Sequence, residues 1–361
     1  MKKVLIEGMT ENKGGKETFI INIYKKLIPT NQYEFYFIAY DKQIAYEDYL
    51  KQTGASVIHV PPRNKGLIKY MLVLDSLLRH EKYDVVWAHK TTLSACELLF
   101  LSKLRGVRKR IVHSHSSSNM GGRFTYLMHS INKVLLPLWV TDRLACSESA
   151  AQWFYRNDNY QIINNGIDVE RFRFDPQIRE SIRKDLGLEG SFVVGHVGRF
   201  GVEKNHTKLL NVFYEVKKLK PDAKLVLCGD GEERTQIETL IEELKLKDSV
   251  LLLGVINNVH QVLQAMDVLM MPSLFEGLPF ALLEAQASGL RCVVSDTVSQ
   301  ESNITGQTVF LPLDLDNSKW AQELLRADSL INRFESASVI SNNGYNINCS
   351  VKEIEQILLY H

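Results

Sequence analysis

The sequence lacks the features of a membrane-spanning, secreted or disulfide-stabilised protein. None of the apolar runs in its 361 residues approaches the roughly 18 residues needed to span a bilayer. The opening MKKVLIEGM is too short and too soon interrupted for a signal peptide. The five cysteines are odd in number, widely spaced and mostly inside apolar runs, which indicates reduced, buried thiols rather than a disulfide framework or a zinc site. These absences predict a cytoplasmic protein.

A large net charge is also absent, because 43 Lys and Arg against 42 Asp and Glu leave only +1. This balance hides an asymmetry: residues 1–170 carry 23 basic and 16 acidic side chains, a net +7, and the remainder carries −6. The basic excess concentrates between Lys103 and Arg143, where Asp142 is the one acid. Such a patch is either a solvated face or a surface for anionic membrane or a phosphate-bearing substrate. No nucleic-acid motif accompanies it, so we expect no nucleic-acid partner.

What the sequence does contain is an alternation of strand and helix patterns over a length that suits two domains. Strands separated by helices predict an α/β fold with doubly wound parallel sheets. We place a first domain at residues 1–172 and a second at 190–345, separated by a charged stretch at 171–190, with a last segment at 346–361. The clearest strands are predicted at 3–7, 33–39, 84–89, 110–115, 192–197, 223–228 and 250–253, and the clearest helices at 17–27, 67–79, 92–104 and 208–218.

One stretch, residues 268–296, has the layout of a ligand site. An apolar strand at 268–271 leads through a loop into a helix at 280–288 and a second strand at 291–295. Ligands of such units bind at the carboxyl ends of strands and against helix N-termini. The loop carries Glu276, and carboxylates accept hydrogen bonds from sugar hydroxyls.

The same stretch offers a second carboxylate and a place for an anion. Glu284 lies eight residues after Glu276, inside the helix. The exposed amides around the start of this helix, helped by its dipole, suit a phosphate. The stretch therefore predicts a site for a phosphorylated sugar, although the two glutamates could equally be a solvated loop residue and a surface helix residue. The residues around the helix start are Gly277, Leu278, Pro279 and Phe280.

Two other strand-to-helix turns carry residues suited to phosphate. Gly14 and Gly15 follow the first strand, where glycines let backbone amides approach a ligand closely, although such a pair is often a simple turn. At the opening of the second domain, Arg199 and Lys204 follow a strand and flank a glycine-bearing turn. A planar guanidinium and a point-charge ammonium in this position form a diphosphate clamp.

Two predicted strands end in histidine, at His89 and at His115. A histidine at the carboxyl end of a strand in an open sheet points toward the ligand crevice, although a hydrogen-bonded core histidine is the alternative. His113 alternates with His115, so it lies on the same face one step deeper.

Two features near these sites allow more than one interpretation. The predicted helix at 120–137 is amphipathic and carries basic residues, so it either docks on a membrane or packs against its own sheet. Asp314 and Asp316 match a metal-binding D-x-D pattern, but lie late in the chain. We interpret these two acids as surface residues and expect no metal.

Several of these motifs resemble glycosyltransferase family 4, in particular its capsular and exopolysaccharide branch. The segment FEGLPFALLEAQASGLRCVVSD, from Phe275, resembles the E-x7-E signature of that family. GHVGRF-x3-KNH, RIVHSHS, GGKE and NGID resemble further family segments. The family consists of retaining enzymes with the GT-B fold, in which two Rossmann-like domains face a cleft. The resemblance therefore implies that fold, with the last helix, at 346–361, crossing back to the first domain.

The resemblance also implies roles for individual residues. Glu276 would contact the donor sugar, Glu284 the ribose hydroxyls, and His115 the donor sugar and its leaving group. Arg199 and Lys204 would neutralise the leaving diphosphate. The backbone at Gly254 and Val255 would meet the nucleobase, and Gly14 with Gly15 would face the donor phosphates and the acceptor across the cleft.

The function implied is retaining transfer of a hexosyl group from a nucleotide sugar, with a UDP-sugar expected, to a saccharide acceptor. We expect that acceptor to be a lipid-linked intermediate of capsular or exopolysaccharide synthesis, reached from the cytoplasmic side of the membrane, and we expect the reaction to need neither cofactor nor metal. Two alternatives stay open. One is an epimerase or phosphorylase on the same fold, and the other is a catalytically silent partner subunit of a glycosyltransferase.

Overall fold

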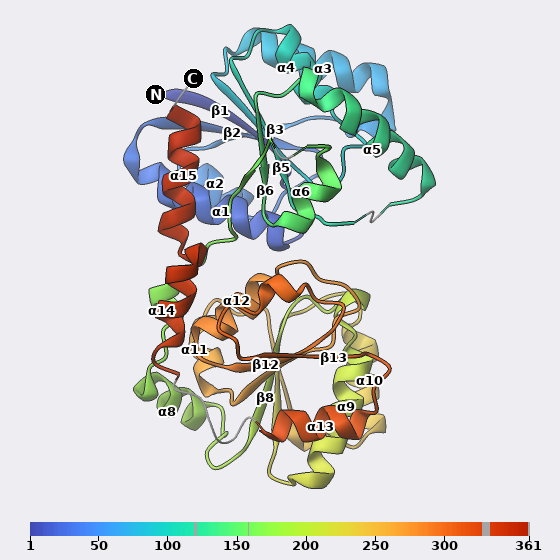
Figure 1. Ribbon diagram of the computed structural model, residues 1–361, viewed down its shortest axis with the longest axis vertical. Coiled ribbons are helices and arrows are strands. Elements are labelled where there is room, and N and C mark those ends of the chain that lie inside the picture. The colour runs from blue at the N-terminus through green and yellow to red at the C-terminus, as the bar shows by residue number, and fades with distance from the viewer. Residues whose placement is uncertain (119–120, 158, 327–332, 360–361) are drawn as a thin grey trace. The chain divides into compact units, whose positions relative to one another are not determined.

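A computed structural model describes the chain from residue 1 to 361 except for residues 119–120, 158, 327–332 and 360–361 (Figure 1). The chain forms two compact units, one of residues 1–166 with 347–361 and the other of residues 167–346. Within the described residues, no helix is both long enough and apolar enough to cross a bilayer.

The described part of the first unit is built on a seven-stranded sheet in the order β3-β2-β1-β4-β5-β6-β7, with every neighbouring pair parallel. The strand order reverses between β1 and β4, which makes the sheet doubly wound, as predicted. The strands are β1 (Lys2–Glu7), β2 (Tyr33–Ala39), β3 (Ser56–His59), β4 (Val85–Lys90), β5 (Lys109–Ser114), β6 (Asp142–Ala145) and β7 (Gln161–Ile162).

Helices cover both faces of this sheet (Figure 1). On one face α1 packs against the C-terminal helix α15, and on the other α3, α4 and α6 share a core with the sheet. Lys2 at the start of the chain donates to the carbonyl of Leu358 in α15 at 3.0 Å, so the last helix belongs to the first unit. The helices are α1 (Gly15–Leu27), α2 (Glu47–Gln52), α3 (Leu67–His80), α4 (Glu97–Leu104), α5 (Arg123–Leu135), α6 (Glu148–Phe154) and α15 (Ile347–Leu359).

Two predicted helices of the first unit differ from the observed ones. The helix predicted at 92–104 begins only at Glu97. The backbone N–H and carbonyl of Leu93 are bound instead by side chains of α5, which keeps residues 91–96 out of the helix. The helix predicted at 120–137 is α5, and Met120 at its expected start lies outside the described residues.

The second unit contains, in its described residues, a six-stranded parallel sheet in the order β10-β9-β8-β11-β12-β13. Here the order reverses between β8 and β11, so this sheet is doubly wound as well. The strands are β8 (Val193–Val197), β9 (Lys224–Cys228), β10 (Val250–Gly254), β11 (Val268–Met271), β12 (Arg291–Ser295) and β13 (Thr308–Leu311).

The helices of the second unit again form two layers. Helices α9, α10 and α13 share one core with the sheet, while α11 packs against α8, and α12 packs against α7 and α14. The stretch at 171–190, which we expected to separate the domains, includes α8, whose Arg179 and Arg183 bind Asp267. The helices are α7 (Val169–Phe172), α8 (Pro176–Asp185), α9 (His206–Leu219), α10 (Arg234–Glu243), α11 (Val259–Ala265), α12 (Phe280–Ala287), α13 (Asn317–Leu325) and α14 (Ser336–Ile340).

All five cysteines are free thiols. Cys96, Cys146, Cys228 and Cys292 are buried, as predicted, whereas Cys349 is exposed on α15.

Candidate functional site

The reversal point of the second sheet brings together two residues that the sequence singled out. Residues 198–205 follow β8 and residues 272–279 follow β11, the two strands between which the order reverses. Across these loops the Lys204 ammonium forms an ion pair with the Glu276 carboxylate, and the two side chains are only 13% and 17% exposed. The backbone N–H of Leu274 donates to the carbonyl of Glu203 at 2.8 Å, which fixes one loop against the other. The pair therefore occupies the edge where open α/β sheets bind ligands.

Arg199 lies in the same loop as Lys204 but does not join this pair. Its guanidinium makes a two-nitrogen contact with the Glu232 carboxylate at 2.8 to 3.1 Å, and both side chains are about half exposed. An exposed pair of this kind is weak and easily exchanged. No sequence motif points to Glu232, which lies in the loop after the neighbouring strand β9.

The loop after β11 leads into a helix start that no side chain caps. Pro279 is the N-cap of α12, and the helix begins at Phe280, as predicted. Among the described residues, no side chain forms a capping hydrogen bond at this N-terminus. The first amides of α12 therefore point outward, and together with the helix dipole they favour an anion. Gly277, Leu278 and Phe280 lie in or beside this start, within a few residues of Glu276.

Glu284 lies on the second turn of α12. Part of its side chain meets solvent, but burial raises the pKa of its carboxyl to about 7, and attraction from Arg171 only partly opposes this rise. Arg171 itself donates to the carbonyl of Asn257 at 3.1 Å. Asn257 follows Gly254 and the 70% exposed Val255, so Arg171 links Glu284 to the loop that the resemblance assigns to the nucleobase.

In the first unit, His89, His113 and His115 lie together, and His113 is on the same face as His115, as predicted. His89 Nδ1 is 2.9 Å from His115 Nε2, so one of these nitrogens donates to the other. Phe19 of α1 packs against all three rings, at centroid distances of 4.8 to 5.9 Å. Burial lowers the pKa of all three, that of His113 to about 3, which keeps the rings neutral at pH 7.

These histidines are also close enough together to be considered as metal ligands, because a nitrogen of each lies within 4.8 Å of the others. His113 stacks on His115 with ring centroids 4.3 Å apart and planes at 29°. Stacked rings direct their in-plane lone pairs side by side, whereas a zinc ion at roughly 2.0–2.1 Å needs lone pairs that converge. The cluster therefore fits ring packing and hydrogen bonding better than metal ligation.

The turn after β1 contains the predicted glycines and one that the prediction missed. Gly14 is the N-cap of α1 and Gly15 its first residue, and no side chain of the described residues caps this helix start either. Gly8 has φ +131°, and a Cβ at its position would lie 2.6 Å from the carbonyl oxygen of His89. Glu7, beside it, pairs with Lys90 at 2.8 Å, so the reversal point of this sheet is also lined with charge.

The acids of the D-x-D pattern face a lysine. Asp314 and Asp316 lie between β13 and α13, and both raise the pKa of Lys208, which burial lowers more strongly. The Lys208 ammonium also donates to the carbonyl of Leu315 between them, at 2.6 Å. The two acids are thus neighbours of a fixed cation.

Comparison with known families finds two matching models. The model described as Glycosyltransferase Family 4 matches residues 13–171, and the one described as Glycosyl transferases group 1 matches residues 178–312. These two matches fall in the first and second units respectively, apart from a few residues at the boundary.

Three relatives match nearly the whole chain. The putative glycosyltransferase EpsF of Bacillus subtilis is 31% identical over 90% of this chain and 88% of its own length. A UDP-Gal:alpha-D-GlcNAc-diphosphoundecaprenol alpha-1,3-galactosyltransferase of Escherichia coli is 31% identical over 85% and 80%. The capsular polysaccharide biosynthesis glycosyltransferase CapH of Staphylococcus aureus is 25% identical over 96% of each chain.

Among solved structures, Anabaena Alr3699/HepE in complex with UDP and glucose superposes with a TM-score of 0.81. The alignment covers 99% of both chains at 19% identity. At this identity the likeness concerns the fold, and it extends over both units.

Proposed function

The chain belongs to glycosyltransferase family 4 and has its GT-B fold, and from this premise we propose that it transfers a hexosyl group, with retention, from a UDP-sugar to a saccharide hydroxyl. The name of the Escherichia coli relative supports a UDP-sugar donor and a lipid-linked acceptor. The name of CapH supports an acceptor from capsular polysaccharide synthesis. A lipid-linked acceptor would hold the enzyme at the cytoplasmic face of the membrane, and five free thiols suit that compartment.

The ion pair between Lys204 and Glu276 carries this proposal. It lies at a strand-end edge beside the uncapped start of α12, where a diphosphate would meet both a cation and free amides. A bound diphosphate would take over the charge of Lys204. Glu276 would then be free to accept hydrogen bonds from the donor sugar.

The main electrostatic requirement of the reaction is stabilisation of the negative charge that develops on the leaving diphosphate. The bond between the anomeric carbon and the diphosphate oxygen breaks, and the acceptor oxygen forms the new bond on the same face of the sugar. The acceptor proton passes to the departing phosphate. Lys204 would stabilise the charge that develops on this phosphate, and Arg199 would join it by exchanging Glu232 for the diphosphate.

The remaining residues would bind parts of the donor that do not react. Glu284 would hold the ribose, and the backbone at Gly254 and Val255 the nucleobase. From the first unit, neutral His115 would donate to the donor sugar, in an orientation set by His89. Gly14 and Gly15 would bring the free amides of α1 to the ligand.

Transfer assays with a set of UDP-sugars and a soluble acceptor analogue test the proposal. We expect one donor to give a product whose anomeric configuration, measured by NMR, is that of the donor. EDTA should leave the transfer rate unchanged, because fixed cations take the place of a metal. Glu276→Gln should lower kcat about 100-fold or more, as loss of one transition-state contact does elsewhere. Loss of transfer in EDTA that magnesium restores would overturn metal independence. Epimerised donor, free sugar phosphate or no product would favour the alternative reactions or a silent subunit.

A further inference from the structure

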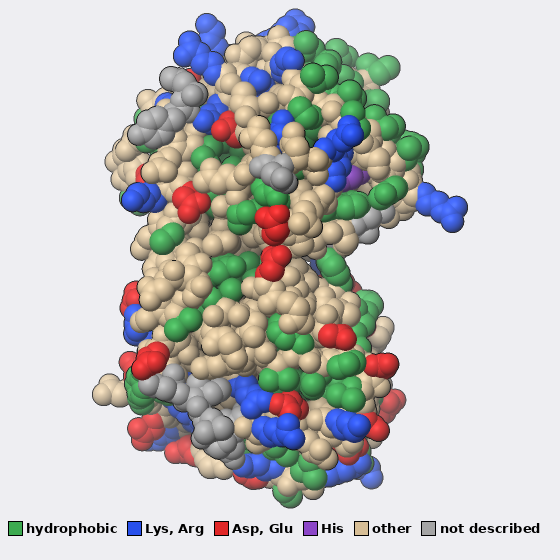
Figure 2. All heavy atoms as spheres, in the orientation of Figure 1, with side chains coloured by type: hydrophobic (Ala, Val, Ile, Leu, Met, Phe, Trp, Pro, Cys, Tyr) green, Lys and Arg blue, Asp and Glu red, His purple; other side chains and the backbone are tan. Residues whose placement is uncertain are grey.

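Helix α5 of the first unit turns its apolar side to solvent. Five apolar residues spaced by three or four positions along α5 and the turn after it are between 44% and 71% exposed. This spacing places them on one side of the helix. Figure 2 shows apolar side chains gathered along this edge of the unit. We call the five residues the α5 stripe: Phe124, Leu127, Ile131, Val134 and Leu138.

The inner side of α5 is held by polar groups instead. Its buried residues are His129 and Asn132. His129 Nδ1 accepts from the N–H of Leu93 at 3.1 Å, and its Nε2 donates to the carbonyl of Trp153 at 3.1 Å. Asn132 donates to the carbonyl of Leu93 at 2.6 Å. The helix therefore packs on its own unit, as one of the two interpretations has it, but mainly through these polar groups, and the stripe faces solvent.

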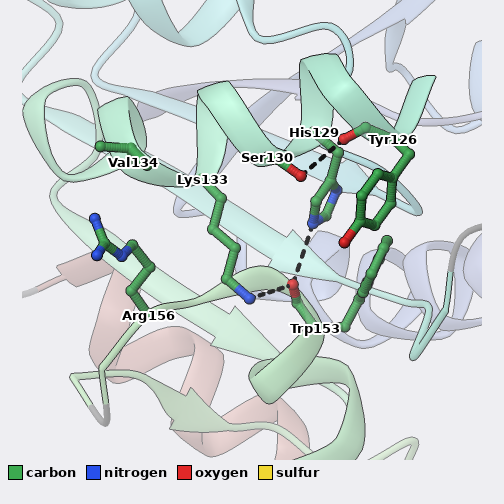
Figure 3. A pocket seen from close by; sticks show the side chains of 7 residues that line it. All are labelled: Tyr126, His129, Ser130, Lys133, Val134, Trp153 and Arg156. Carbon is green, nitrogen blue, oxygen red and sulfur yellow. Dashed lines mark hydrogen bonds between the residues drawn. The ribbon is translucent and has the colours of Figure 1, made fainter. Parts of the chain in front are cut away.

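A pocket opens beside the stripe, between α5 and the end of α6 (Figure 3). Its volume is about 240 Å³, smaller than the roughly 300–1,000 Å³ of typical small-molecule sites. Tyr126 and Trp153 line one side of it, with His129 stacked on the Trp153 ring at 4.2 Å. Lys133 and Arg156 line the other side. Tyr and Trp are the aromatic residues enriched at membrane surfaces.

The charges of this pocket are not balanced. The Lys133 ammonium donates to the carbonyls of Gln152 and Trp153 at 2.8 and 2.7 Å, and within the described residues neither it nor Arg156 has a carboxylate partner. Burial, and then repulsion from Arg156, lowers the pKa of Lys133. The indole N–H of Trp153 is buried, and it too has no partner in the part of the chain that the structure describes. An anion in the pocket would balance the charges of Lys133 and Arg156.

The surroundings are basic as well. From residue 98 to 141 the sequence carries seven Lys and Arg and no Asp or Glu. The neighbouring α3 and α4 add exposed apolar residues, among them Ile68, Leu72 and Leu104. A second copy of this chain would bring an equally basic face, so self-association through the stripe is opposed by charge.

We propose that α5 lies on an anionic lipid bilayer, with the α5 stripe in the acyl boundary and a lipid phosphate in the pocket between Lys133 and Arg156. An exposed apolar stripe flanked by cations is the pattern of a helix that binds in the membrane interface. The proposal rests on the proposed function only in that a lipid-linked acceptor brings the enzyme to a membrane. Lipid binding itself needs neither donor nor acceptor.

Flotation of the full-length protein with vesicles tests the proposal. We expect binding to vesicles of phosphatidylcholine with about one third phosphatidylglycerol, and little binding to phosphatidylcholine alone. Lys133→Gln with Arg156→Gln should weaken binding about tenfold or more, because cations near an anionic surface supply much of the attraction. Leu127→Ser with Ile131→Ser should abolish it. The matched control, Lys319→Gln with Lys352→Gln, removes two exposed cations elsewhere and should leave binding within about twofold.

Three outcomes would overturn the proposal. Equal binding to neutral and anionic vesicles, or unchanged binding by the pocket variant, would contradict the phosphate site. A dimer in sedimentation that the stripe variant disrupts would identify the stripe as a protein interface. If the protein did not bind vesicles but still transferred sugar to a soluble acceptor, membrane binding by α5 would be rejected and the proposed function would be unaffected. Glu276→Gln, in contrast, should lose transfer and keep vesicle binding, and thermal unfolding should show that each variant is folded.

Discussion

At the scale of single residues, charged groups at the sheet edge of the second unit pair mainly with one another. Lys204 and Glu276 satisfy each other and are largely buried, whereas Arg199 and Glu232 pair at the surface. Glu284 has no hydrogen-bond partner for its carboxylate among the described residues. A polar ligand can replace such ion pairs within the protein. A carboxyl with a raised pKa, such as that of Glu284, is a common feature of functional sites. These groups together suit a site for a polar ligand.

Glu284 should make both stability and nucleotide binding depend on pH. Its folded pKa, about 7, is above its ordinary value of 4.5, so the folded state holds the proton more tightly. Its contribution to the free energy of unfolding is therefore fully present below pH 4.5 and is lost as the pH rises through 7. The shift corresponds to at most about 3 kcal/mol, and partial exposure reduces it. UDP should bind more tightly at pH 8 than at pH 6, because the ionised carboxylate is the better acceptor for ribose hydroxyls.

Glu284→Gln separates these two effects. The amide mimics the protonated acid, so the variant should unfold at a higher temperature than the unaltered protein at pH 8 and at the same temperature at pH 5. UDP affinity should fall about tenfold at pH 8, with the loss of charge-assisted hydrogen bonds. Calorimetry at both pH values measures the unfolding temperature by heating and the UDP affinity by titration. Parallel pH profiles for the two proteins would show that Glu284 is not the titrating group.

At the scale of the elements, the turn after β1 depends on a close approach between two strands. Gly8 has φ +131° and its α-carbon faces the His89 carbonyl, whereas Gly54 has φ +91° with open space around it. Gly54→Ala should lower the free energy of unfolding by about 1–2 kcal/mol, because backbone strain is its only penalty. Gly8→Ala should lower the free energy of unfolding by about 1–3 kcal/mol more than Gly54→Ala does, because the new methyl group overlaps the carbonyl of His89.

Urea unfolding followed by tryptophan fluorescence compares these two variants. Three of the four tryptophans, Trp87, Trp139 and Trp153, lie in the first unit, so the signal reports mainly on the unit that carries both glycines. If Gly8→Ala were no less stable than Gly54→Ala, the backbone around Gly8 would have room that the structure does not give it.

The elements also show what a sequence pattern can and cannot predict. Alternation along β5 predicted that His113 and His115 share a face, because side-chain direction in a strand follows from position alone. The spacing of apolar residues along α5 predicted an amphipathic helix in the same way. Which side of that helix meets the protein depends on partners distant in sequence, namely Leu93 and Trp153. The pattern therefore left both interpretations open.

At the scale of the whole molecule, the order of strands and helices was enough to predict two doubly wound sheets. The sequence also identified Lys204 and Glu276, because each follows a strand and the carboxyl ends of parallel strands meet at one edge. It did not predict that these two would pair, or that Arg199 would turn to Glu232, because such pairings depend on which strands become neighbours. Arg171 was missed for the same reason, since its contacts join α7 to residues far along the chain.

We propose that the edge between β8 and β11 binds the diphosphate of a nucleotide sugar. Calorimetric titration with UDP, GDP and ADP tests it most directly, using the unaltered protein, Lys204→Gln, Arg199→Gln and the control Lys319→Gln. We predict selective binding of UDP, weakened about 10- to 100-fold in Lys204→Gln, less in Arg199→Gln and not in the control, because a largely buried cation interacts more strongly with a phosphate than an exposed one. Absence of nucleotide binding, or UDP affinity that Lys204→Gln leaves unchanged, would contradict the claim.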